Sequence, residues 1–249
     1  RDEYGFSSGV QWLANRGYAV LQPNYRGSGG YGKTFYELGL GEVGRAMQDD
    51  LDDAMDWAVA QGIADPERVC LVGGSYGGYA SVWGLIRNPE RYRCAASWAS
   101  VTDWPKMLRY DRKYLTREAQ KNWEAKIEGE DEVNMAAVSP ARLASRLSRP
   151  LLLGHGTSDP NVPFTQHEGM MKAAKDAPVK PTELVIRRAG HSFGDADKRK
   201  EWLDALDVFL AEHNPADQLD KDGTFRPPVD PELLENFVPL ELTTPPASE

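Results

Sequence analysis

The chain has 249 residues, 41% of them hydrophobic, and a formal net charge of −9. This length allows one large domain with a buried core, and the acidic balance excludes the basic patch that a nucleic acid or an anionic membrane requires. No apolar run approaches the roughly 18 residues of a membrane span, and the chain opens without a signal-peptide pattern, so its compartment stays open between cytoplasm and periplasm.

Short apolar runs with turn signals at their ends predict five buried strands, at 18–23, 68–73, 94–98, 150–154 and 183–187. Stretches with helical spacing lie between them, at 10–15, 47–61, 79–87, 164–175 and 196–213. Strands that alternate with helices favour the α/β class, with a mostly parallel sheet and helices on both faces. We therefore expect residues 1–213 to form one such domain.

Three further segments carry expectations of their own. Residues 103–149 are polar and aromatic, which predicts a helical insertion above the sheet. Residues 214–249 hold seven prolines, eight acids and two basic residues, which predicts an extended or disordered tail. A packed arm is the alternative, because its apolar residues need cover: Leu233, Leu234, Phe237, Val238 and Leu240. Cys70 and Cys94 lie in strand-like runs, and we interpret them as buried thiols.

The run at 68–73 ends in a G-x-S-x-G turn, within the segment RVCLVGGSYGGY at 68–79. A strand, this turn and a small-residue helix make the layout of a nucleophile elbow, which exposes a serine hydroxyl at the carboxyl end of the strand. Ser75 is therefore the candidate nucleophile. We expect that a Cβ atom at position 73 or 77 would clash in the turn, so that Gly73 and Gly77 are both required there.

A serine nucleophile needs a histidine base and an acid that orients it. His191 follows the strand predicted at 183–187, and Asp159 follows the one at 150–154, so both lie with Ser75 at the carboxyl edge of the sheet. The order Ser75, Asp159, His191 is that of the α/β-hydrolase triad. We interpret the other three histidines as structural or solvated: His155, His167 and His213.

Other motifs fit less well. Residues 27–34 match the P-loop pattern G-x-x-x-x-G-K-T, but three glycines weaken the helix that must follow it. Residues 39–44 match a dinucleotide pattern without an apolar strand before it. A second G-x-S-x-G at 5–9 follows charged residues, so Ser7 is better placed near a helix start. The acids and histidines show no zinc-ligand spacing, and we predict no metal and no cofactor.

Four motifs in chain order resemble those of the catalytic domain of the prolyl oligopeptidase family: NYRGSGGYG at 24–32, GGSYGGY at 73–79, HGTSD at 155–159 and GHSF at 190–193. They are most similar to the acylaminoacyl-peptidase and dipeptidyl aminopeptidase branch, and the likeness covers about residues 5 to 213. The resemblance implies an α/β-hydrolase fold, with Ser75 as nucleophile, Asp159 as orienting acid and His191 as general base. It also implies that the N–H of Tyr76 is one oxyanion donor.

The family pattern includes parts that this sequence does not contain. These are an H-G-G-P segment with the second oxyanion donor, the first strands of the sheet, and an amino-terminal β-propeller that filters substrates. We therefore expect the chain to be the carboxyl-terminal part of a longer protein. Loss of one oxyanion donor costs other serine hydrolases about 10²- to 10³-fold in rate, so we expect the chain alone to be weakly active.

The resulting hypothesis is a serine peptidase that releases acylated residues or dipeptides from short peptides through an acyl-enzyme. For the S1 pocket, the resemblance points to an apolar wall at the start of the insertion, although core packing of the same residues is equally compatible: Val101, Trp104, Tyr110 and Tyr114. A carboxylesterase of the same fold is the first alternative. A noncatalytic hydrolase-like interaction module is the second.

Overall fold

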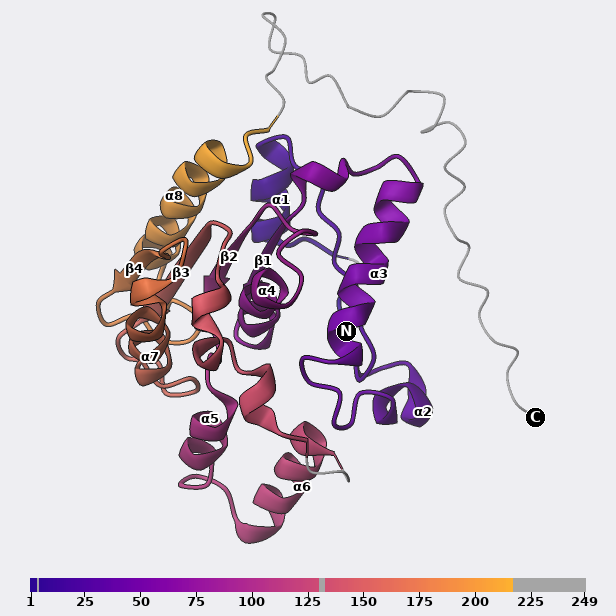
Figure 1. Cartoon of the computed structure of the whole chain (residues 1–249), viewed down its shortest axis with the longest axis vertical. Helices are drawn as coiled ribbons and strands as arrows, with labels where there is room; N and C mark the ends of the chain where they lie inside the picture. The colour runs from indigo at the N-terminus through magenta and orange to yellow at the C-terminus, as the bar shows by residue number, and fades with distance from the viewer. Residues whose placement is uncertain (4, 130–132, 217–249) are drawn as a thin grey trace, which may run out of the picture.

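One parallel sheet is at the centre of the molecule (Figure 1). The computed structural model describes residues 1–3, 5–129 and 133–216. Within them the strand order is β1-β2-β3-β4, and every neighbouring pair is parallel. The strands are β1 (Cys70–Gly74), β2 (Cys94–Trp98), β3 (Leu151–Gly156) and β4 (Thr182–Ile186). The α/β class and four of the five predicted strands are confirmed.

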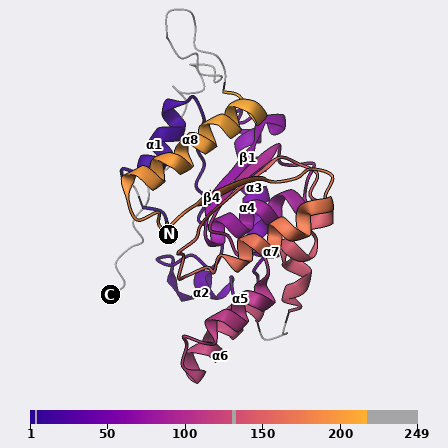
Figure 2. The same ribbon diagram turned by 90° about the vertical axis from the view of Figure 1, so that its left-hand side faces the viewer.

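Helices cover both faces of this sheet, as predicted (Figures 1 and 2). One face carries α1 (Ser8–Asn15) and α8 (Ala196–His213), and the other carries α3 (Ala46–Ala60), α4 (Tyr76–Arg87) and α7 (Thr165–Ala173). Three more helices extend from one end of the sheet, at the bottom of Figure 1: α2 (Gly32–Glu37), α5 (Trp104–Asp111) and α6 (Arg117–Glu128). Short 3₁₀ turns lie at Pro66–Arg68, Met135–Val138, Pro140–Arg142, Ala144–Arg146 and Ala174–Asp176.

The core follows from the alternation of side chains along the strands. Leu151 and Leu153 of β3 pack into a cluster with α4 and α5, whereas Leu152 between them packs against α8 on the other face. All three are essentially inaccessible to solvent. The strands are apolar on both faces for this reason, which is the pattern of a parallel sheet covered twice.

The strand predicted at 18–23 does not form. Within the described residues this segment pairs with no strand, and Leu21 is 49% exposed. Tyr18 instead donates its hydroxyl hydrogen to the carbonyl oxygen of Asn214, at 2.8 Å. An apolar run with turn signals indicates where a strand could form, but a strand also needs a neighbour for its backbone hydrogen bonds.

The prediction of two buried thiols is also wrong, because Cys70 and Cys94 form a disulfide. Their residues are register partners on β1 and β2, and their Cα atoms are 4.7 Å apart, within the range that a disulfide bridges. Register is a property of the folded sheet and could not be derived from two separate apolar runs. The bond ties the strand before Ser75 to its neighbour.

The described residues of the predicted insertion at 103–149 form α5, α6 and three 3₁₀ turns, so the expected helical structure is confirmed there, and their interpretation as an insertion stays a prediction. The apolar residues of the predicted tail lie outside the described residues, and the division into a domain at 1–213 and a tail stays a prediction. Asn214 is buried and donates to the carbonyl oxygen of Arg68 at 3.0 Å, which fixes the end of α8. Among the helices that the structure describes, none is long and apolar enough to cross a membrane.

Candidate active site

Ser75 lies between the end of β1 and the first residue of α4. Its backbone has φ of 57° and ψ of −119°, which is an uncommon conformation for a residue with a side chain. Backbone hydrogen bonds hold the turn in place. The Ser75 N–H donates to the Trp98 carbonyl at 2.9 Å, and the Ser75 carbonyl accepts the N–H of Tyr79 at 2.9 Å. Strain of this kind, fixed by surrounding bonds, is typical of functional sites.

Of the two glycines around the serine, only Gly73 lies where there is no room for a side chain. A Cβ at Gly73 would lie 2.4 Å from the backbone of Gly77, whereas a Cβ at Gly77 would have no atom within 4 Å beyond its chain neighbours and the backbone of its own helix. The expectation that both glycines avoid a clash is therefore correct for Gly73 and wrong for Gly77. The close approach is that of the first turn of α4 onto β1.

This difference predicts opposite effects for two alanine substitutions. Gly73→Ala should lower the free energy of unfolding by about 3 kcal/mol, because the new methyl group meets backbone that cannot rotate away. Gly77→Ala should raise it by up to about 1 kcal/mol, because alanine is the better helix former. Chemical denaturation of both variants measures this, and equal effects would contradict the packing of the turn described above.

Asp159 and His191 form a hydrogen-bonded pair. Asp159 Oδ2 lies 2.8 Å from His191 Nδ1, and Asp159 Oδ1 accepts the N–H groups of Asn161 and Val162 at 2.8 and 3.0 Å. The Asp159 side chain is fully buried, and that of His191 is 20% exposed. A carboxylate anchored in this way at one oxygen presents the other to Nδ1, which leaves Nε2 free to accept a proton.

The loop of His191 is held by Trp98 at the end of β2. The indole N–H of Trp98 donates to the His191 carbonyl at 2.8 Å, and its ring stacks on Phe193 with centroids 4.3 Å apart. Phe193 itself has a φ of 67°, so the chain turns sharply just after the histidine. Sequence reasoning did not identify Trp98, because its role depends on two loops that meet only in the fold.

The other histidines do not line the pocket around Ser75. His155 is buried in β3, where burial lowers its pKa, and its Nε2 lies 3.0 Å from the Val162 carbonyl. His167 on α7 is also buried with a lowered pKa, and its Nε2 lies 2.8 Å from Glu183 Oε1. His213 is the last residue of α8.

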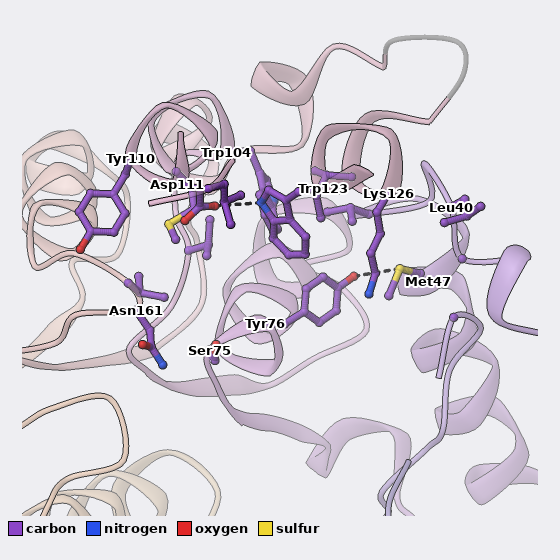
Figure 3. A pocket seen from close by; sticks show the side chains of 18 of the residues that line it. Leu40, Met47, Ser75, Tyr76, Trp104, Tyr110, Asp111, Trp123, Lys126 and Asn161 are labelled. Carbon is purple, nitrogen blue, oxygen red and sulfur yellow. Dashed lines mark hydrogen bonds between the residues drawn. The ribbon is translucent and has the colours of Figure 1, made fainter. Parts of the chain in front are cut away.

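Ser75 and His191 line the same pocket, a cavity of about 760 Å³ between the elbow and α5 and α6 (Figure 3). All four residues predicted for its wall lie there: Val101, Trp104, Tyr110 and Tyr114. Val101 and Trp104 are buried and belong to the core as well as to the pocket wall, so the packing interpretation is confirmed for them and their role as an S1 wall stays a prediction. Tyr110 donates its hydroxyl hydrogen to the Pro160 carbonyl at 2.8 Å, and Tyr114 is 70% exposed.

Sequence reasoning missed most of the remaining wall, including Tyr25, Met47, Met107, Asp111, Trp123, Lys126, Asn161 and Val162. A signal existed for some of them. Trp104, Met107 and Asp111 are spaced i, i+3 and i+7, which places them on one face of α5. Asn161 and Val162 follow the acid Asp159 at the second and third positions after it. Trp123 and Lys126 come from α6, whose approach to the pocket depends on the tertiary structure.

A buried polar network fixes the start of α5. Asp103 caps the helix by accepting the N–H of Lys106 at 3.1 Å, and its carboxylate also accepts from Arg142 Nε at 2.8 Å. Gln166 of α7 accepts the backbone N–H groups of Thr102 and Asp103 at 2.9 and 2.8 Å. The pocket wall on α5 is thereby attached to both α7 and the Arg142 turn.

Tyr76 contributes its backbone and its ring to the site. As the first residue of α4, its N–H has no carbonyl within the helix to bond, so it is available beside Ser75. Its ring lies 5.6 Å from that of Tyr25 and 6.4 Å from that of Trp104, and burial raises the pKa of its hydroxyl well above the usual value. The side chain is therefore a neutral part of the pocket wall.

The P-loop-like segment at 27–34 does not have the structural context of a P-loop in the described residues. A helix does begin at Gly32, but α2 has only six residues and no strand precedes it among the described residues. Lys33 is 3.5 Å from Glu37 on the same helix. Before it, Arg26 binds Asp50 of α3 with two side-chain bonds of 2.9 and 2.5 Å. Burial would raise the pKa of Asp50, but the hydrogen bonds from Arg26 outweigh it and lower that pKa.

At the start of the chain, Ser7 precedes α1 and its side chain accepts the N–H of Val10 at 3.5 Å. The prediction of a helix start for this second G-x-S-x-G pattern is therefore confirmed.

Comparisons with known proteins give a consistent result. The family model described as "Prolyl oligopeptidase family" matches residues 4–215. Dipeptidyl aminopeptidase BIII of Pseudoxanthomonas mexicana is 36% identical over 85% of this chain and 31% of its own length. The acylamino-acid-releasing enzyme of Arabidopsis thaliana is 30% identical over 75% of this chain and 25% of its own.

Among solved structures, a puromycin-hydrolyzing peptidase of Mycobacterium tuberculosis superposes with a TM-score of 0.68 at 28% identity, over 77% of this chain and 29% of that one. The shared fold is that of the α/β hydrolases. The chain spans less than a third of the length of each of these proteins.

Proposed function

The chain belongs to the prolyl oligopeptidase family, and from that membership we propose that it is the catalytic part of a serine peptidase with Ser75, Asp159 and His191 as its triad. The hydrogen bond between Asp159 and His191 is the observation that carries this proposal, because it joins a buried acid to a base on the wall of the pocket that also holds a strained serine. The proposal is also supported by position, since Ser75, Asp159 and His191 follow the carboxyl ends of β1, β3 and β4, where catalytic groups gather in α/β folds.

In the proposed reaction, the Ser75 hydroxyl oxygen attacks the carbonyl carbon of the scissile bond while His191 Nε2 takes its proton. The carbonyl electrons move to oxygen, and the N–H of Tyr76 binds this oxyanion. When the intermediate collapses, the amine leaves with the proton from His191, and Ser75 is left acylated. Water then attacks the acyl carbon while His191 Nε2 takes its proton. The bond to the Ser75 oxygen breaks, Ser75 regains a proton from His191, and the acyl group leaves as a carboxylic acid. Asp159 stabilises the imidazolium in both halves of the reaction.

For the substrate, we propose short peptides from which an acylated residue or a dipeptide is released. The support is the names of the relatives, a dipeptidyl aminopeptidase and an acylamino-acid-releasing enzyme, which share this segment of chain. Those proteins are more than three times as long as the matched segment. We propose that a β-propeller accounts for part of this further length in the whole protein and limits the size of the substrate.

A comparison of amide and ester substrates tests the reaction type. The peptidase proposal expects release of 4-nitroaniline from dipeptidyl and acetyl-aminoacyl 4-nitroanilides, with kcat/KM falling as the peptide is lengthened upstream in the full-length protein. Hydrolysis of 4-nitrophenyl esters without any hydrolysis of the anilides would instead indicate a carboxylesterase of the same fold. Asp195→Asn is the control variant, and its hydrolysis of both substrate classes should equal that of the parent. Its carboxylate caps α8 and forms no hydrogen bond with His191 in the described structure.

A further inference from the structure

The wall of the active-site pocket contains one acidic side chain, Asp111, among the pocket residues that the structure describes. It is the last residue of α5, on the same face of the helix as Trp104 and Met107. Trp104 packs against Tyr76, the neighbour of Ser75, so the face runs from the nucleophile outward. Seven residues of helix correspond to a rise of about 10 Å, so Asp111 lies about two turns from Trp104 along α5.

The carboxylate of Asp111 is oriented by a neutral donor. Trp123 of α6 donates its indole N–H to Asp111 Oδ2 at 2.9 Å, as the dashed line in Figure 3 shows. This bond goes to Oδ2, and no hydrogen bond from the described part of the chain reaches Asp111 Oδ1. In Figure 3 this pair lies across the pocket from Ser75. One carboxylate oxygen is thus fixed, and the other is available to a ligand.

The cations near Asp111 bind elsewhere. Arg112 pairs with Glu124 at 2.7 Å, and the Lys113 ammonium lies 5.8 Å from the centre of the Tyr110 ring. Lys126, the cation on the pocket wall, lies 5.1 Å from the ring centre of Tyr36 and 6.0 Å from that of Trp123, and in the described structure it forms no ion pair with Asp111. Figure 3 shows it on the side of Leu40 and Met47. Within the described residues, no ion pair includes Asp111.

A half-buried carboxylate without a cation is an unfavourable element of an aromatic pocket, because burial disfavours the charged form. Burial accordingly raises the pKa of Asp111, and the hydrogen bond from Trp123 only partly opposes this. A group of this kind in a substrate cleft is a candidate for a binding role, since a ligand cation would restore the balance.

We propose that Asp111 is a specificity-determining residue that binds the cationic end of a lysine or arginine side chain at the P1 position of the substrate. This inference rests on the proposed peptidase function. Lysine and arginine carry an apolar stem that can lie along aromatic and aliphatic walls, here Trp104 and Met107, while the charged head reaches a polar partner.

Substrate selectivity tests the proposal. Alanyl-lysyl and alanyl-norleucyl 4-nitroanilides differ in charge at the end of a similar stem, and the ratio of their kcat/KM values isolates that charge. We expect the enzyme to prefer the lysyl substrate, and Asp111→Asn to lower the ratio by about 10- to 100-fold, because the ion pair is lost while the side-chain volume is kept. Asp111→Glu should recover part of the preference. Asp53→Asn, an exposed acid on α3, should leave the ratio unchanged.

Three results would overturn the assignment: an enzyme with no lysyl preference, a ratio that Asp111→Asn does not change, or evidence that Asp111 binds the α-amino group of the substrate. In the third case Asp111→Asn would lower kcat/KM equally for the lysyl and norleucyl substrates. N-acetylation of both substrates would then abolish the effect of the substitution.

A binding measurement separates this inference from the proposed function. Ser75→Ala cannot acylate, so the Kd values of the two uncleaved dipeptide amides for this variant report the pocket without the chemistry. The lysyl amide should bind more tightly than the norleucyl amide, and adding Asp111→Asn should remove the difference. Equal Kd values would contradict the role of Asp111 alone, whereas absent turnover by the parent enzyme with a clear Kd difference would contradict the peptidase reaction alone.

Discussion

Ser75→Ala is expected to abolish covalent labelling by a fluorophosphonate probe and to reduce kcat for anilide substrates to background, a loss of at least about 10³-fold. In other serine peptidases, removal of the nucleophile lowers kcat by about 10⁶-fold. The fold should survive, because serine and alanine meet the same backbone strain at the φ of 57° and no hydrogen bond to the Ser75 side chain stabilises the described structure. Gel fluorescence and thermal unfolding of the same samples measure both points.

The chain supplies a matched control in Ser7, the centre of the second G-x-S-x-G pattern. Ser7→Ala removes the cap of α1 and should cost about 1 kcal/mol of stability, with labelling unchanged. If the probe labels the Ser75→Ala variant as strongly as the parent, the nucleophile assignment is wrong. If neither protein is labelled while both are folded, the noncatalytic interaction module becomes the better interpretation.

Asp159→Asn is expected to lower kcat by about 10⁴-fold, the size of the effect of the corresponding change in a well-studied serine protease. The physical reason lies in the two oxygens of Asp159. One accepts two backbone N–H groups, and the other faces His191 Nδ1 at 2.8 Å. An asparagine held by the same loop presents its NH₂ group to Nδ1. The imidazole then carries its proton on Nε2, where the base must be free.

Steady-state kinetics and labelling rates of Asp159→Asn measure this effect. Asp195→Asn is the matched control, because Asp195 is the nearest acid beyond the His191 loop in the sequence and asparagine also caps helices well. Its kcat should stay within about twofold of the parent. A comparable loss in both variants would mean that overall charge, and not the tautomer of His191, controls the rate.

The fold could be predicted from the sequence wherever the signal was local. Four strands and the major helices follow from runs and periodicities that each segment carries by itself, and α8 begins and ends at the predicted residues. The predictions that failed are those that depend on which strands lie next to each other. The run at 18–23 looks like a strand but finds no neighbour in the described structure, and the disulfide between Cys70 and Cys94 depends on the register of β1 and β2.

The candidate site divides in the same way. The elbow, the acid and the base come from short motifs that follow strands, and the structure brings Asp159 and His191 into contact and puts Ser75 and His191 on one pocket. Their catalytic roles stay predictions. Asp111 and Trp123 could not be found in this way, because one ends α5, the other lies on α6, and only the fold brings the carboxylate to the indole.

Trp98 has a consequence for how the site tolerates motion. Its carbonyl accepts the N–H of Ser75, and its indole donates to the carbonyl of His191. The backbones of Ser75 and His191 are therefore both hydrogen-bonded to one residue at the end of β2. A shift of Trp98 would act on the segments of both residues at once, although both are far from it in the sequence.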